Sequence, residues 1–159
     1  MKAAVLYEAK TPLVVEEMDL DDPAPGEVLV KMMASGVCHS DWHVVKGEWT
    51  QCELPIVLGH EGAGIVEAIG PRVASVKPGD HVILSWKASC GLCEMCQKGW
   101  VNLCLRPLEP GARPRISKTG GEVSILAGLG TFGSYAVVPE VAAVKIDEDV
   151  PFAQAALVG

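Results

Sequence analysis

Short apolar runs rich in valine, isoleucine and alanine alternate along this chain with turns that contain glycine and proline. Runs of this length and composition, bounded by turns such as Pro25-Gly26 and Pro78-Gly79-Asp80, are typical of β-strands. We therefore predict strands at residues 1–7, 13–18, 27–37, 64–69, 81–85, 134–138 and 142–146. The pattern indicates a mainly β protein.

Helical segments are few in this pattern. Residues 40–46 are predicted to form a short helix capped by Ser40, and residues 151–158 to begin another, with Pro151 at an early helical position. Residues 105–129 carry three prolines and Gly120-Gly121, and we expect a surface excursion there. The 159 residues, of which 49% are hydrophobic, suffice for one core and favour a single domain.

The charge balance limits the partners of this protein. A formal net charge of −7 argues against nucleic acid and against an anionic membrane surface, because both are bound by basic patches. No apolar stretch approaches membrane-spanning length, and residues 1–7 show no secretory signal pattern. We expect a cytoplasmic protein that binds neither nucleic acid nor a membrane.

Four of the six cysteines fall close together, in a C-x2-C-x2-C-x7-C array of Cys90, Cys93, Cys96 and Cys104. Two consecutive CxxC steps place three thiolates on one turn, and the seven-residue return allows a fourth to complete the tetrahedron that Zn²⁺ prefers. Disulfides, a redox role or buried thiols are the alternatives. A reducing compartment disfavours disulfides, so the array predicts a structural zinc site.

A second group of chemically active residues lies upstream of that array. A single cysteine and a single histidine, Cys38 and His60, make only a partial metal site. Asp41 could accept the ring N–H of a ligating histidine, Ser40 could pass a proton, and the imidazole of His43 could exchange one. Taken singly, Cys38 could be a buried thiol, Ser40 a helix cap, Asp41 a first-turn acid and His43 a solvated histidine. Together they suggest a metal-assisted proton relay.

The motifs together resemble those of the zinc-containing alcohol dehydrogenases of the medium-chain dehydrogenase/reductase superfamily. The resemblance rests on residues 38–43, 59–66 and 77–82 and on the four-cysteine array, in the family's order. It covers the N-terminal, GroES-like catalytic domain of those enzymes. It implies that residues 1–159 form a partly open β-barrel with short helices and a zinc-binding lobe at about residues 87–108. The C-terminal Rossmann dinucleotide-binding domain would be absent from this chain.

The resemblance also implies a set of roles in oxidising a primary or secondary alcohol to an aldehyde or ketone. Cys38 and His60 would hold a catalytic zinc ion, with Glu61 as an occasional or second-sphere ligand. Hydride would pass to NAD or NADP. The remaining roles are proton acceptance by Ser40, relay of the proton through the cofactor ribose to His43, orientation of His60 by Asp41, and contact of His39 with the cofactor pyrophosphate.

Three aromatic residues, Trp49, Trp86 and Phe132, lie where the family lines its substrate cleft. They would favour small or flat, unbranched alcohols, although ordinary core packing is the alternative. The substrate could instead be a polyol, an aryl alcohol or a thiol adduct of formaldehyde. A stand-alone, non-catalytic GroES-like zinc module is the alternative from another class.

Three features depart from the family pattern. The third protein ligand of the catalytic zinc usually lies on a Gly-Cys segment beyond this domain, and the chain ends at Gly159. We therefore expect the chain to be inactive alone. Separately, the full-length form is expected to be a homo-oligomer. Residues 128–133 match GxGxxG, but a predicted strand follows them where a dinucleotide site needs a helix. Cys52 matches no ligand position and is expected to be a free thiol.

Overall fold

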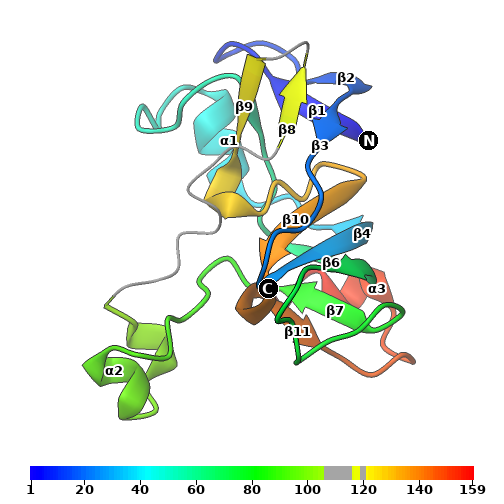
Figure 1. Ribbon diagram of the computed structural model, residues 1–159. Helices are drawn as coiled ribbons and strands as arrows, with labels where there is room; N and C mark the ends of the chain where they lie inside the picture. Colours follow the sequence, from blue (N-terminus) through cyan, green and yellow to red (C-terminus); the bar gives the residue numbers. More distant parts are fainter. Residues whose placement is uncertain (106–115, 119–120) are drawn as a thin grey trace.

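Two β-sheets contain most of the regular structure in the computed structural model, which describes residues 1–105, 116–118 and 121–159. The sheets lie one above the other in the view of Figure 1, and a small lobe that carries a short helix projects away from them. The mainly β prediction is confirmed.

The five-stranded sheet forms the larger core. Its strands run in the order β10-β4-β6-β7-β11, and every pair is antiparallel. Alternate residues of β4 point inward, so that Val28 and Val30 are fully buried and Val30 pairs with Val66 of β6. The strands are β4 (Glu27–Ser35), β6 (Gly62–Ile69), β7 (His81–Leu84), β10 (Tyr135–Pro139) and β11 (Ala143–Lys145).

The six-stranded sheet has shorter strands in the order β2-β1-β5-β9-β8-β3. The β5–β9 pair is parallel, and the other pairs are antiparallel. Val5 and Val57, which belong to two neighbouring strands of this sheet, are fully buried. The strands are β1 (Lys2–Leu6), β2 (Val14–Glu17), β3 (Asp19–Leu20), β5 (Ile56–Val57), β8 (Ile116–Lys118) and β9 (Gly121–Ile125).

The helices are short, as expected. Their bounds are α1 (His39–Val45), α2 (Glu94–Gln97) and α3 (Phe152–Ala155), with 3-10 turns η1 (Val101–Leu103), η2 (Leu126–Gly128) and η3 (Glu140–Ala142). The α1 helix is capped by Cys38 and not by Ser40, so that prediction is wrong. The physical reason is Asp41, whose carboxylate accepts the Cys38 N–H at 3.0 Å and so starts the helix one residue earlier. No helix in the described ranges meets the length and hydropathy needed to cross a membrane.

The predicted surface excursion at residues 105–129 is wrong for its C-terminal part. Strand β9 lies within the six-stranded sheet, and Val123 and Leu129 are each 2% exposed. Strand β9 was hard to predict, because it pairs with β5, a strand of only two residues. Residues 106–115 and 119–120 lie outside the described part of the chain.

Candidate metal centres

The four-cysteine cluster, formed by Cys90, Cys93, Cys96 and Cys104, brings one sulfur from each residue to within 4.8 Å of the others. Cys93 Sγ lies 3.5 Å from Cys96 Sγ and 3.9 Å from Cys104 Sγ. Four sulfurs at a Zn–S distance of about 2.3 Å would be roughly 3.8 Å apart at the edges of the tetrahedron. The spacing therefore fits a zinc ion with no position left for a substrate.

Backbone N–H groups point at these sulfurs. The Cys90 N–H donates to Cys104 Sγ at 3.3 Å, and the Cys93 N–H donates to Cys90 Sγ at 3.4 Å. The Leu105 N–H donates to Cys93 Sγ at 3.5 Å. The Cys96 and Leu105 amides lower the pKa of Cys93 to about 6, whereas desolvation and the neighbouring Cys93 raise the pKa of Cys96 to about 12. A divalent cation bound among these sulfurs would favour the thiolate form of all four.

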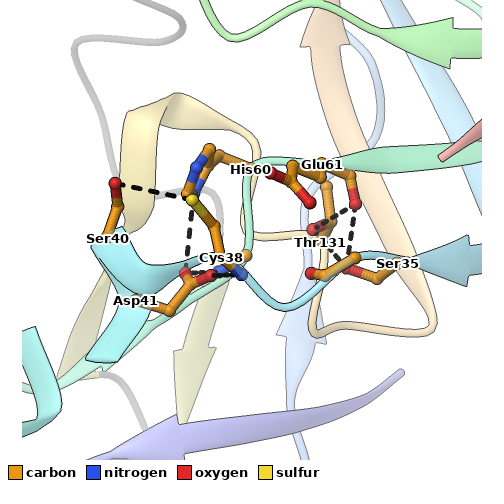
Figure 2. Close-up of polar contacts among 9 residues, drawn as sticks. Ser35, Cys38, Ser40, Asp41, His60, Glu61 and Thr131 are labelled. Carbon is orange, nitrogen blue, oxygen red and sulfur yellow. Dashed lines mark hydrogen bonds and ion pairs between the residues drawn. The ribbon is translucent and has the colours of Figure 1, made fainter. Parts of the chain in front are cut away.

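The second candidate site, which we call the Cys38 cluster, consists of Cys38, His60 and Glu61. One ligand atom from each lies within 4.8 Å of the others. Cys38 is the N-cap of α1, and the other two residues immediately precede β6. Figure 2 shows the three side chains converging from these two segments. Three donors leave a fourth tetrahedral position open, which is the arrangement of catalytic zinc sites.

Asp41 joins the two segments of the Cys38 cluster. It is 2% exposed, and its carboxylate accepts the N–H of Cys38 at 3.0 Å and that of Gly59 at 2.9 Å. Its Oδ1 also lies 3.5 Å from Nδ1 of His60, a buried atom without a hydrogen bond in the described ranges. With Nδ1 facing the carboxylate, Nε2 is left for a metal.

The predicted relay residues lie on α1. Ser40 Oγ is 3.6 Å from Cys38 Sγ. The His43 ring pairs through Nδ1 with the Glu48 carboxylate, stacks on Trp49 at a centroid distance of 5.9 Å and meets the His39 ring edge-on at 4.7 Å.

Glu48 was not anticipated from the sequence. The side chains of Lys46 and then His43 lower its pKa by hydrogen bonding, so the carboxylate stays charged beside the imidazole. The sequence offers one signal for this pair, an acidic residue five positions after His43. The pairing itself depends on how the chain turns after α1.

The three predicted cleft aromatics have different surroundings. Phe132 lines two surface grooves of ≈ 350 and ≈ 570 Å³, and Asp41 lines the larger one. Trp49 packs against an apolar cluster that contains Leu6 and Leu58, and Trp86 is 52% exposed. Of the three aromatic residues, Phe132 alone lines these two grooves, which supports a cleft role for it.

Cys52 is half-buried against the same apolar cluster as Trp49. Burial raises the pKa of its thiol, which makes the thiolate scarce near neutral pH. It is a free cysteine, as expected.

Comparison with known proteins agrees with this geometry. Residues 24–148 match the family model of the alcohol dehydrogenase GroES-like domain. The chain belongs to this family. It is 44% identical to alcohol dehydrogenase B of Mycobacterium tuberculosis strain H37Rv and 41% identical to S-(hydroxymethyl)glutathione dehydrogenase of Haemophilus influenzae, over 99% of its own length. The crystal structure of benzyl alcohol dehydrogenase from Acinetobacter calcoaceticus superposes with a TM-score of 0.84 at 34% identity, over 99% of this chain.

The GroES-like domain spans only part of these relatives. The chain covers 44% of the length of both curated enzymes and 44% of the benzyl alcohol dehydrogenase chain. The prediction of a GroES-like β-barrel with short helices is confirmed by the solved structures.

Proposed function

We propose that this GroES-like domain is the zinc-binding part of an alcohol dehydrogenase that oxidises a primary or secondary alcohol by hydride transfer to NAD or NADP. The observation that carries the proposal is the Cys38 cluster, where three donors of the types zinc accepts meet with one position open. The four-cysteine cluster, which has no open position, would be the structural site.

Bound zinc would act as a Lewis acid that eases loss of the alcohol proton, and the dinucleotide would accept hydride. Ser40 would receive that proton, and the 3.6 Å separation of its hydroxyl oxygen from Cys38 Sγ supports this role. His43, one helical turn further on, would carry the proton outward. Its Nδ1 is engaged by Glu48, so Nε2 is the nitrogen available for exchange.

The same helix offers groups for the cofactor. His39 is exposed at the start of α1, where its imidazole would contact a pyrophosphate. We infer that most of the dinucleotide is bound by a second domain. We also infer that the full-length protein is cytoplasmic, since six free cysteines suit a reducing compartment. That it forms a homo-oligomer is inferred from the family resemblance alone.

The substrate class rests on the groove that Phe132 and Asp41 share. An aromatic wall such as Phe132 would favour small or flat, unbranched alcohols. The names of the relatives add benzyl alcohol and S-(hydroxymethyl)glutathione as substrates to test.

The test fuses the chain to a dinucleotide-binding domain of an alcohol dehydrogenase and follows NADH formation with primary alcohols. Cys38→Ala should reduce kcat/KM by at least about a hundredfold, because the Lewis acid is lost. Metal analysis should still find the zinc of the four-cysteine cluster. Cys52→Ala removes a half-buried thiol outside both clusters and should retain activity. Equal activity in the Cys38→Ala protein would refute the catalytic assignment and favour a non-catalytic zinc module.

A further inference from the structure

Thr131 is a buried threonine, 2% exposed, that lies against the His60–Glu61 segment. A Cβ atom on Gly59 would lie 2.4 Å from Thr131 Oγ1, and one on Gly62 would lie 2.7 Å from Thr131 Cγ2. Neither distance is sterically tolerable. The two glycines that flank the metal-binding pair therefore leave a slot that the threonine fills.

A chain of hydroxyl groups connects Thr131 to the backbone of Glu61. Thr131 Oγ1 lies 2.7 Å from Ser35 Oγ, and Ser35 Oγ lies 3.1 Å from the Glu61 carbonyl oxygen. Each hydroxyl has one proton to donate. The two shorter contacts are satisfied when Thr131 donates to Ser35 and Ser35 donates to the carbonyl oxygen, which Thr131 Oγ1 itself also approaches at 3.5 Å. Figure 2 shows these contacts beside the Cys38 cluster.

The Glu61 peptide is also tied to the segment that leads to Cys38. The Gly36 N–H donates to the Glu61 carbonyl at 2.8 Å. A Cβ atom on Gly36 would lie 2.1 Å from Glu61 Oε2, so the carboxylate lies over this glycine, two residues before Cys38. The position of the carboxylate relative to the Cys38 sulfur thus depends on how the carbonyl of the same residue is held.

Thr131 is brought to this slot by the glycine-rich turn at residues 128–133, the GxGxxG match. Gly130 has a φ of +58°, which L-residues rarely adopt. After it, the Thr131 N–H donates to the Gly59 carbonyl and the Phe132 N–H to the Leu58 carbonyl, both at 3.0 Å. The turn therefore braces the segment that precedes His60.

We propose that Thr131, acting through Ser35, is a positioning residue for metal binding at the Cys38 cluster. It fixes the Glu61 peptide so that the carboxylate stays within ligand distance of Cys38 and His60. The role rests on the proposed function, because it requires a metal at that cluster.

The test titrates Co²⁺ into the 159-residue chain with zinc already in the four-cysteine cluster. Absorption by the cobalt–thiolate group of Cys38 reports binding. Thr131→Val keeps the shape of the side chain and removes the hydroxyl, and it should lower Co²⁺ affinity by about tenfold or more, as loss of a partner behind a metal ligand does. Thr131→Ser restores the hydroxyl and should bind within about twofold of wild type.

Two further comparisons separate positioning from general loss of structure. Ser134 lies in the same loop, and its hydroxyl accepts the Lys2 N–H at 3.0 Å; Ser134→Ala should leave Co²⁺ affinity unchanged. In a Glu61→Ala background, Thr131→Val should have no further effect, because the group it positions is gone. Ser35 is exposed, so Ser35→Ala reports on the same chain of hydroxyls if the valine variant does not fold.

The outcomes distinguish the two proposals. If the wild-type chain binds no Co²⁺ through Cys38, the proposed function fails. If it binds but Thr131→Val and Ser35→Ala both match wild type, the positioning role alone fails. An effect of Thr131→Val that persists undiminished without the Glu61 carboxylate would also overturn that role.

Discussion

A single buried carboxylate holds together the two segments that carry the Cys38 cluster. Asp41 accepts backbone N–H groups from Cys38 and Gly59 and faces the ring of His60. Charged acceptors of buried N–H groups contribute more than neutral ones, at about 1.5–3 kcal/mol each. The residue therefore serves both folding and the placement of metal ligands.

Replacing Asp41 with asparagine should separate these two effects. The amide nitrogen cannot accept a hydrogen bond, so one of the two N–H groups loses its partner. We expect the free energy of unfolding to fall by about 2 kcal/mol. Co²⁺ affinity at the Cys38 cluster should fall by about 10–100-fold. Urea unfolding and cobalt titration measure the two quantities. Asp149→Asn, at an exposed carboxylate, is the control, and unchanged affinity in Asp41→Asn would contradict the placement role.

The family resemblance implied that Asp41 lies beside His60, and the two side chains are 3.5 Å apart. It could not predict that the carboxylate mainly binds backbone N–H groups, since those bonds depend on where the two segments cross. The Ser35–Thr131 contact spans 96 positions and has no local pattern at all. Contacts of this kind appear only when the sheets are formed.

At the scale of elements, the four-cysteine lobe differs from the sheets in what holds it together. Between residues 90 and 105, Cys104 alone is buried, and large apolar side chains such as Leu92 and Trp100 are exposed at 81% and 53%. Apolar burial therefore contributes little here. The sulfurs, which the spacing of the cysteines predicted to lie together, are the centre of the lobe.

Removal of one sulfur should loosen this lobe without loosening the sheets. Bound zinc stabilises a site by about 4 kcal/mol when free zinc is a thousandfold above its dissociation constant. In Cys90→Ala we expect amide exchange in α2 and η1 to become faster by up to about a thousandfold, while β4 and β6 keep their protection. Hydrogen exchange read by mass spectrometry measures both regions. Cys52→Ala is the matched control, and unchanged exchange in α2 would refute a metal-held lobe.

At the scale of the whole molecule, short apolar runs and turn residues predicted the β class and all five strands of the five-stranded sheet. The six-stranded sheet was harder to predict. Strands β5 and β3 have only two residues each, and the parallel β5–β9 pair joins segments more than sixty residues apart. Such strands are defined by their partners and not by their own pattern.

An ion pair between Asp80 and Lys145 makes the stability of the five-stranded sheet depend on pH. Asp80, 6% exposed before β7, accepts from Lys145 of β11 at 2.7 Å and from the Lys77 N–H at 3.0 Å. These bonds, that of Lys145 first, lower the pKa of Asp80. Because the folded pKa lies below the unfolded value of about 3.9, the contribution is complete above that pH and is lost as the pH falls through the folded pKa.

Asp80→Asn should reveal this contribution as a pH-dependent difference in the free energy of unfolding. The variant should be less stable than wild type by a constant amount between about pH 7 and 5, and the difference should shrink below about pH 4, where wild-type Asp80 becomes protonated in the unfolded chain. Urea unfolding at a series of pH values measures the difference, with Asp149→Asn as a control that stays level. A deficit that stays unchanged as the pH falls below about 4 would mean that the loss comes from packing, because a charge contribution must shrink once the unfolded chain binds a proton that the folded chain does not.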